Sequence, residues 1–226
     1  MITIIDYGMG NLRSVQKAFE HIGRKAVITD DKNRILNSSM IVLPGVGSFD
    51  AAMHNLKKTG LAETIRNFVK SGRPFLGLCL GLQVLFEKSE EGNASGLGLL
   101  KGCVKKFRFS QLSRLPKLSV GQITLSSRLK IPHMGWNNVH VTAAGKYAAQ
   151  KKKIFRKIEN DSYFYFVHSY YIEPEDKNII SSATFYGKKF ASSVLCGNIF
   201  ATQFHPEKSQ KNGLNLLRNY ADYTGN

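Results

Sequence analysis

A short turn bracketed by glycines, Gly77-Leu78-Cys79-Leu80-Gly81, constrains the fold of this chain more than any other feature. It follows the apolar run Pro74-Phe75-Leu76 and precedes a stretch in which apolar residues recur at helical spacing. A strand that turns this sharply into a helix strains the backbone of the central residue, and only small neighbours leave room for it. The pattern therefore predicts a buried strand, a tight turn at Cys79 and a helix that begins at once.

Cys79 is the first candidate for a catalytic residue. The positive end of the helix dipole favours a thiolate there, and the turn is the counterpart of a G-x-S-x-G nucleophile elbow with sulfur in place of oxygen. Free cysteines usually act as small buried hydrophobes, however, and we interpret Cys103 and Cys196 in that way. On this turn alone, a structural thiol and a nucleophile are equally good interpretations of Cys79.

A second motif, Gln203-Phe204-His205-Pro206-Glu207, supplies the groups that a cysteine nucleophile needs. His205 would lie just past the end of an apolar, strand-like run, and Pro206 fixes a backbone angle between His205 and Glu207. With this spacing, Glu207 can hydrogen-bond one imidazole nitrogen while the other faces the nucleophile. The two motifs together predict a triad of Cys79, His205 and Glu207 that converges in space from distant parts of the sequence.

Strand-like and helix-like segments alternate through the first half of the chain. This alternation predicts an α/β fold with a mostly parallel sheet, helices on both faces, and functional residues at the carboxyl ends of the strands. The expected strands are Ile2–Ile5, Ala26–Thr29, Met40–Leu43 and Phe75–Gly77, and the expected helices are Leu12–Ile22, Ala51–Lys58, Leu61–Val69 and Leu80–Glu87.

The second half predicts antiparallel strands joined by short turns and added to the same sheet. Residues 110–131, rich in Ser and Lys, predict a flexible loop. Because no internal repeat or clear boundary interrupts the chain, we expect a single domain over residues 1–226. The expected strands are Val104–Phe109, Asn138–Thr142, Tyr163–Ser169, Ile179–Tyr186, Phe190–Cys196 and Ile199–Gln203, before a closing helix at Gly213–Tyr223.

Positive charge is concentrated in one segment. The chain carries 32 Lys and Arg against 16 Asp and Glu, and residues 101–160 alone hold fourteen basic side chains and one acidic one, Glu159. Such a segment attracts phosphates, nucleic acid or an acidic protein, although a solvated lysine-rich face is an equally good interpretation. Few aromatic residues interleave with these charges and no nucleic-acid-binding motif is present, which argues against nucleic acid as a partner.

The sequence also bears on the compartment. Three cysteines, an odd number, do not indicate a disulfide framework. No uninterrupted apolar stretch is long enough to span a membrane, and the first residues lack the features of a signal peptide. We therefore expect a cytoplasmic protein with no membrane association.

Six motifs, taken in order, resemble those of the class I, triad-type glutamine amidotransferases. The resemblance is closer still to the glutaminase subunits of imidazole glycerol phosphate synthase, and the first and fourth motifs point to this subfamily. The motifs lie at 5–15, 43–49, 77–83, 132–137, 165–170 and 203–209, so they span nearly the whole chain.

The resemblance implies that the chain hydrolyses glutamine to glutamate and ammonia. It implies a heterodimer with a (β/α)8 cyclase subunit, which receives the ammonia through a channel and makes imidazole glycerol phosphate for histidine biosynthesis, and it implies neither a metal ion nor a cofactor. The positions that it assigns are Val46, Gly47 and Leu80 for the oxyanion hole, Gln83, Ser169 and Tyr170 for glutamine, and His133, Met134, Trp136, Asn137 and Lys208 for the partner interface. His168, flanked by apolar residues, we interpret as a satisfied buried histidine and not as the base.

Three alternatives remain open. The chain can be a related glutaminase that feeds ammonia to another synthase, such as one acting on surface-polysaccharide sugars, because the basic segment 101–157 departs from the compact family pattern. It can be a non-catalytic activator of the same fold, although the intact triad argues against this. In a different class, it can be a basic nucleic-acid-binding protein, whose binding would fall steeply with salt.

Overall fold

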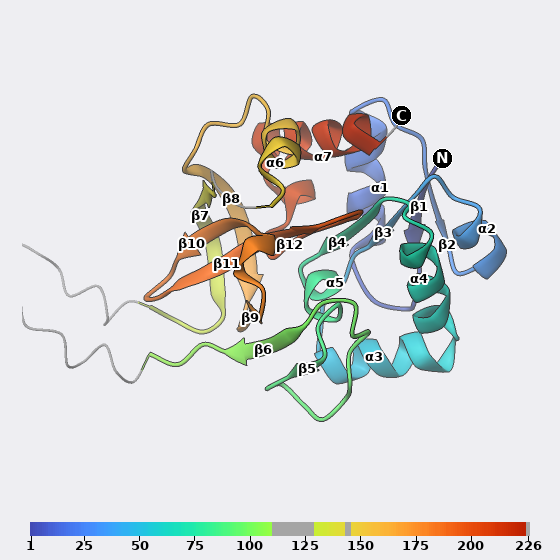
Figure 1. Ribbon diagram of the computed structural model, residues 1–226, viewed down its shortest axis with the longest axis horizontal. Helices are drawn as coiled ribbons and strands as arrows, with labels where there is room; N and C mark the ends of the chain where they lie inside the picture. The colour runs from blue at the N-terminus through green and yellow to red at the C-terminus, as the bar shows by residue number, and fades with distance from the viewer. Residues whose placement is uncertain (110–128, 143–145, 225–226) are drawn as a thin grey trace, which may run out of the picture.

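A large mixed β-sheet forms the centre of the protein (Figure 1). The computed structural model describes residues 1–109, 129–142 and 146–224. The main path of the sheet runs in the order β2-β1-β3-β4-β12-β11-β10-β7-β8. It is extended through β11 by β9 (Tyr170–Pro174), β6 (Gly102–Lys106) and β5 (Lys88–Ser89). The strands of the main path are β1 (Ile2–Ile5), β2 (Ala26–Thr29), β3 (Met40–Leu43), β4 (Phe75–Leu78), β7 (His133–Val141), β8 (Ser162–His168), β10 (Ile180–Phe185), β11 (Lys189–Cys196) and β12 (Ile199–Thr202).

The amino-terminal half of the sheet is parallel, as the sequence predicts. β1 lies between β2 and β3, and β4 lies between β3 and β12, all in parallel register. Phe75 of β4 is opposite both Ile41 of β3 and Ile199 of β12, so the carboxyl ends of these three strands lie at one edge. From β12 through β11 to β8, the main path is antiparallel, which confirms the expected additions in the second half.

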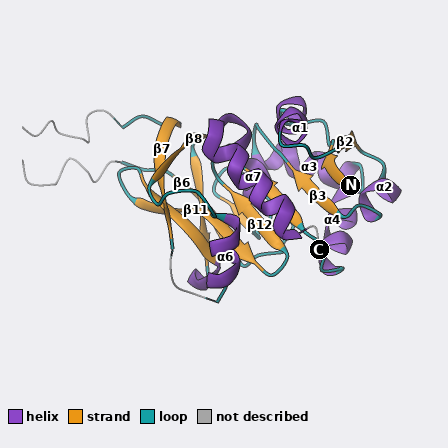
Figure 2. Ribbon diagram, turned by 90° about the horizontal axis from the view of Figure 1, so that it is seen from above, coloured by secondary structure: helices purple, strands orange, loops and turns teal. Residues whose placement is uncertain are grey.

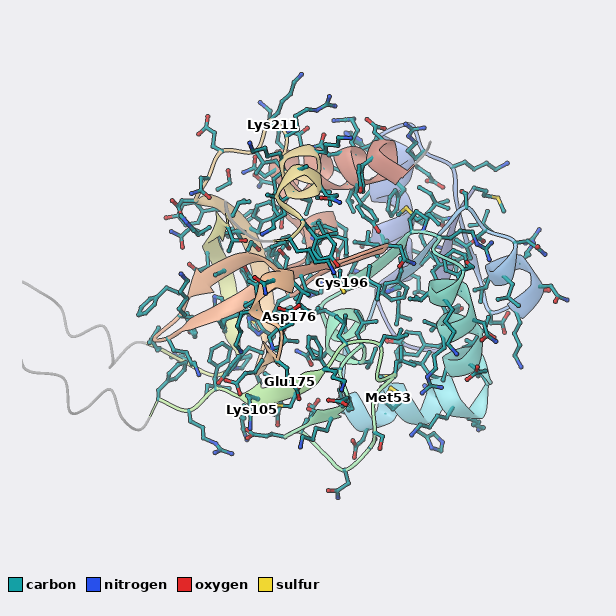
Figure 3. All side chains as sticks on the ribbon, in the orientation of Figure 1. Met53, Lys105, Glu175, Asp176, Cys196 and Lys211 are labelled. Atoms are coloured by element: carbon teal, nitrogen blue, oxygen red, sulfur yellow. The ribbon has the colours of Figure 1, made fainter. Side chains whose placement is uncertain are left out.

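Helices cover both faces of the parallel strands because successive side chains of each strand point to opposite faces. Ile41 packs with α3 and α4 on one face, and Val42 packs with α1 and α7 on the other. Figure 2 shows α7 lying across the sheet, and Figure 3 labels Met53, which α3 contributes to the first of these cores. The helices are α1 (Leu12–His21), α2 (Lys32–Leu36), α3 (Phe49–Lys58), α4 (Leu61–Lys70), α5 (Leu80–Gln83), α6 (Ala148–Ile154) and α7 (Gln210–Thr224).

Two predicted elements have different bounds in the structure. The helix expected over Leu80–Glu87 ends at Gln83, because the carbonyls of Val84 and Leu85 accept hydrogen bonds from residues 97–100 instead of continuing the helix. β7 begins at His133, five residues before the strand expected at Asn138. Residues 133–139 of β7 pair with β8, a pairing that the sequence does not predict.

Several short elements were not predicted from the sequence. They are α2, α6, β5 (Lys88–Ser89) and β9 (Tyr170–Pro174). β6 (Gly102–Lys106) overlaps the strand expected at Val104–Phe109, but both of its ends lie earlier in the chain. Most of the loop expected over residues 110–131 lies outside the described residues. Among the helices that the structure describes, none combines the length and hydropathy needed to cross a bilayer.

Candidate active site

The candidate site lies where three neighbouring parallel strands end. β3 runs into the turn Pro44-Gly45-Val46-Gly47, β4 runs into Cys79, and β12 is followed after Gln203 and Phe204 by His205. Because β4 lies between β3 and β12, the turn, the thiol and the imidazole come from adjacent strand ends. This is the edge at which open α/β sheets place their functional residues.

Cys79 has the backbone conformation that the glycine bracket predicts. Its φ is 54° and its ψ is −104°, a region that residues with a side chain rarely adopt. A Cβ on Gly77 would lie 2.7 Å from the carbonyl oxygen of Gly81, and a Cβ on Gly81 would collide with the carbonyl oxygen of Leu43. The N–H of Cys79 donates to the carbonyl of Thr202 at 2.7 Å, which ties the elbow to β12.

His205 and Glu207 form a buried pair. Nδ1 of His205 lies 2.8 Å from Oε1 of Glu207, and the two side chains are only 4% and 3% exposed. The chain places this pair on a short 3₁₀ turn (Pro206–Lys208) just after β12, where Pro206 sets the bend. The geometry holds the other ring nitrogen, Nε2, away from Glu207; Nε2 is buried and forms no hydrogen bond with any other described residue.

The charge of His205 depends on its two neighbours. Burial by itself would lower the pKa of His205, but the negative charges of Cys79 and Glu207 outweigh it and raise the pKa to about 10. Cys79 thus lies close enough to influence the imidazole, although no hydrogen bond of good geometry joins Sγ to Nε2. A thiolate and an imidazolium stabilise each other in this arrangement.

The turn after β3 and the start of α5 present backbone N–H groups next to the thiol. Gly47 has a φ of +101°, which favours glycine, and Leu80 is the first residue of α5, so its N–H has no acceptor within the helix. A Cβ on Gly45 would lie 2.5 Å from the hydroxyl of Tyr7 and 2.9 Å from Cβ of Leu80. The close approach of the β3 turn to the elbow therefore requires glycine at position 45.

Tyr7 is a further buried polar group beside the elbow. Its hydroxyl forms no hydrogen bond within the described part of the chain. Burial, and to a smaller extent the charge of Cys79, raises the pKa of Tyr7 above its ordinary value. The hydroxyl is therefore neutral at physiological pH.

A pocket of about 280 Å³ opens in front of Cys79 and brings together all the residues expected for the oxyanion hole and for glutamine. The sequence did not single out Glu91, which also lines it. Oε2 of Glu91 accepts the N–H of Phe49 at 2.7 Å, at the start of α3. The residues lining the pocket are Val46, Gly47, Cys79, Leu80, Gln83, Glu91, Pro132, Val167, His168, Ser169 and Tyr170.

The residues expected at a partner interface do not share one environment. Met134 and Trp136 are 62% and 46% exposed, and Nζ of Lys208 lies 5.9 Å from the ring centre of Tyr165. His133 is only 2% exposed, so its side chain faces the interior of this structure, and its place at a partner interface remains a prediction. Successive side chains of β7 alternate between faces, which turns Met134 outwards and His133 inwards.

The other end of the parallel strands carries none of this chemistry in the part of the chain that the structure describes. A larger hollow of about 740 Å³, lined by Ser39, Arg73 and Asn198 among others, lies near the amino ends of the parallel strands. The described residues of its wall include no cysteine, histidine or carboxylate. Within the described ranges, no three His, Cys, Asp or Glu side chains gather as a metal site. The chemistry-bearing side chains are thus concentrated at the carboxyl ends.

The basic segment is partly engaged within the chain. Lys105, labelled in Figure 3, lies 3.2 Å from Glu90, and Arg108 lies 3.4 Å from the same carboxylate. Lys151 of α6 is buried, and its Nζ donates to Oγ1 of Thr142 at 2.8 Å. These three side chains interact with other groups of the same chain. The positive charge that the segment can offer to a bound anion is therefore smaller than its net charge.

Comparisons with known proteins agree with this geometry. The family model "Glutamine amidotransferase class-I" matches residues 3–222. The chain is 45% identical to "Imidazole glycerol phosphate synthase subunit HisH" of Syntrophotalea carbinolica, over 98% of this chain and 100% of that protein, and 44% identical to the protein of the same name from Aquifex aeolicus, over 96% and 94%.

Solved structures with low sequence identity share the fold. A crystal structure of a glutamine amidotransferase is 15% identical, with a TM-score of 0.69 and complete coverage of both chains. A chain in the structure of PurLQS from Thermotoga maritima is 19% identical, with a TM-score of 0.66 over 98% of this chain and 97% of that one. At these identities the likeness concerns the arrangement of the sheet and helices.

Proposed function

Because this chain belongs to the class-I glutamine amidotransferase family, we propose that it hydrolyses glutamine to glutamate and ammonia with Cys79, His205 and Glu207 as its triad. The observation that carries the proposal is the convergence of a strained cysteine elbow with a buried His205–Glu207 pair, held at 2.8 Å, on two adjacent parallel strands. A nucleophile, a base and a group that orients the base are the parts that acyl transfer through a thioester requires.

The thiolate of Cys79 attacks the side-chain amide carbon of glutamine. His205 carries the proton that the departing ammonia needs, and Glu207 holds the imidazole in position and stabilises its positive charge. The N–H groups of Leu80 and Gly47 stabilise the oxyanion of the tetrahedral intermediate. Water, deprotonated by the now neutral His205, then cleaves the glutamyl thioester, which releases glutamate and restores the thiolate–imidazolium pair.

The same pocket offers groups for the other end of glutamine. Glu91 uses Oε2 to accept the N–H of Phe49, and its second oxygen is available to the substrate's ammonium group. The walls formed by Gln83, Ser169 and Tyr170 provide polar atoms for the carboxylate and the side-chain amide. We propose that Glu91 is the residue that distinguishes glutamine from simple amides.

The released ammonia, we propose, is delivered to a synthase partner, in keeping with the names of the HisH relatives, which call those proteins subunits of a synthase. Met134 and Trp136 form an exposed apolar pair on β7, which begins directly after Pro132 of the pocket wall. Large exposed side chains of this kind are common in the centre of protein interfaces. The partner that we propose is a (β/α)8 cyclase that makes imidazole glycerol phosphate, with the complex working in the cytoplasm.

The test is the release of glutamate from glutamine by the purified chain, with and without a cyclase partner and the nucleotide substrate of that cyclase. Cys79→Ala should abolish turnover, while Cys103→Ala, which removes another free thiol outside the pocket wall, should not change it. Turnover that survives in Cys79→Ala would exclude the triad. Basal turnover that a competent cyclase fails to stimulate would preserve the triad and direct the search to a different synthase.

A further inference from the structure

A continuous chain of hydrogen bonds links strand β7 to the sulfur of Cys79. It begins at the half-buried Asn137 and passes through two buried histidines to the carbonyl oxygen of Tyr170. From that oxygen it continues through Gln83 and Gln203 to Cys79. The proposed function gives no role to Gln203, Asn137 or the two histidines.

The carbonyl of Tyr170 fixes the tautomers of both histidines. Nδ1 of His168 lies 2.7 Å from this oxygen, which only accepts, so Nδ1 must carry the proton. Burial lowers the pKa of His168 to about 3, so the ring is neutral and its Nε2 is an acceptor. His133 approaches that Nε2 with Nδ1 at 2.9 Å and must donate to it.

The outer end of the chain agrees with this assignment. Burial lowers the pKa of His133 to about 4, so its ring is also neutral and its Nε2 accepts. Nδ2 of Asn137 donates to that nitrogen at 3.2 Å and to the carbonyl of Phe185 at 3.0 Å, while its Oδ1 accepts the N–H of Asn138 at 2.8 Å. Every donor along this half therefore points towards Tyr170.

The inner half fixes two side-chain amides in the same way. Nε2 of Gln83 donates to the carbonyl of Tyr170 at 3.2 Å and to Oε1 of Gln203 at 3.1 Å. With its oxygen used in this way, Gln203 directs Nε2 at Sγ of Cys79, 3.6 Å away. Gln203 is fully buried, so water does not compete for this N–H.

We propose that Gln203 is a catalytic residue that stabilises the thiolate of Cys79 through an N–H···S hydrogen bond, and that His133 and His168 are positioning residues that hold its amide in this orientation through Tyr170 and Gln83. The inference rests on the proposed role of Cys79 as the nucleophile. A hydrogen bond to a charged group is stronger than one between neutral groups, and burial strengthens it further. Gln203 therefore favours the charged, reactive form of the sulfur.

The test is the rate at which iodoacetamide alkylates Cys79, measured from pH 5 to 9 by mass spectrometry of the peptide that contains Cys79. Gln203→Met keeps the size of the side chain and removes the N–H. The midpoint of the rise in rate should move to higher pH by about one to two units, the shift that corresponds to one hydrogen bond to a charged group. An unmoved midpoint in the folded variant would overturn the proposal.

Thr202→Val is the matched control for a purely structural effect. Thr202 is the buried neighbour of Gln203, and its hydroxyl donates to the carbonyl of Phe204 at 2.9 Å. This variant should lower the melting temperature and leave the midpoint of alkylation unchanged. An equal shift in both variants would assign Gln203 to structure alone.

A second pair of variants tests the positioning role, including the case in which Gln203→Met does not fold. His168→Phe removes the donor to Tyr170 and should shift the midpoint in the same direction by a smaller amount, whereas His168→Asn retains a donor near the Nδ1 position and should restore it. A wild-type midpoint in folded His168→Phe would exclude the relay. Glutamine turnover by Cys79→Ala is a separate result, so a failure of the triad can be distinguished from a failure of this inference.

Discussion

Replacing Cys79 with glycine should give a more stable protein than replacing it with alanine, the reverse of the usual order. Both variants lack the sulfur, so their difference isolates the backbone. At a φ of 54° and a ψ of −104°, a residue with a Cβ carries strain of about 1–3 kcal/mol, and glycine relieves it. Glycine's greater freedom in the unfolded chain costs about 0.5–1 kcal/mol. The net expectation is that the glycine variant unfolds with a free energy about 1 kcal/mol higher than that of the alanine variant.

Urea denaturation of the two variants, followed by circular dichroism, measures this difference directly. For a chain of this size, 1 kcal/mol corresponds to roughly 2–4 °C in melting temperature, which a thermal scan resolves. Ala51→Gly, at an exposed position of α3 with ordinary helical geometry, is the control and should lose about 0.5–1 kcal/mol. If Cys79→Gly is less stable than Cys79→Ala by the same margin as this control, the elbow stores no strain and the argument fails.

Three further predictions concern the pair beside Cys79, a buried histidine and the glycine bracket. Glu207→Gln should lower the pKa of His205 from about 10, move the alkaline limb of kcat/KM to lower pH and reduce kcat by about 10²–10⁴-fold; an unmoved limb in a full pH profile would contradict this. His168→Asn should reduce the acid sensitivity of the fold. Burial lowers the pKa of His168 to about 3, so the stability that its neutral ring supports is present above about pH 6.5 and is lost as the pH falls below that. Urea titrations should show wild type losing about 1.5 kcal/mol more than the variant between pH 6.5 and 5. Gly81→Ala should lower the free energy of unfolding by more than about 4 kcal/mol or prevent folding, because the added Cβ collides with the carbonyl of Leu43. Gly98→Ala is the control: no atom lies near its added Cβ, so this variant should remain folded in the same thermal scan.

The parts of the fold that could be predicted from the sequence are those whose signals are local. The turn at Cys79 is predicted by one glycine two residues before it and another two residues after it. The close contacts at Gly77 and Gly81 explain why no larger residue fits at either position. Pro206 likewise marks the bend between His205 and Glu207 in the sequence itself. Each of these features depends on neighbours along the chain.

The misplaced bounds have long-range causes. Apolar residues continue at helical spacing beyond Gln83, yet the helix stops because residues 97–100 donate to the carbonyls of Val84 and Leu85. At the start of β7, Gly135 and a mixed run of polar and apolar residues suggest a loop, but pairing with β8 makes it a strand. No pattern within either segment reveals the distant partner.

The same distinction explains which site residues the sequence missed. Glu91 stands in a polar stretch that is typical of an ordinary loop, and its place in the pocket depends on α3, some forty residues earlier. In the sequence, Gln203 is an ordinary residue at the end of a strand. The orientation of its amide depends on a hydrogen bond from Gln83, which is 120 residues away in sequence. A carboxylate or an amide carries no local signal of this kind, because its role depends on what it meets in space.

The site also concentrates features that are costly to a fold. Cys79 has a positive φ, and the hydroxyl of Tyr7, Nε2 of His205 and Oε2 of Glu207 are buried without partners among the described residues. Each such feature costs on the order of 1–3 kcal/mol and persists only where the surroundings hold it. Here the N–H of Cys79 is bound to Thr202, and the N–H of His205 donates to the carbonyl of Tyr165 at 2.9 Å. Of these atoms, Nε2 of His205 is the one that the proposed mechanism brings to the reacting groups of the substrate, so part of the cost in folding there serves selective binding during catalysis.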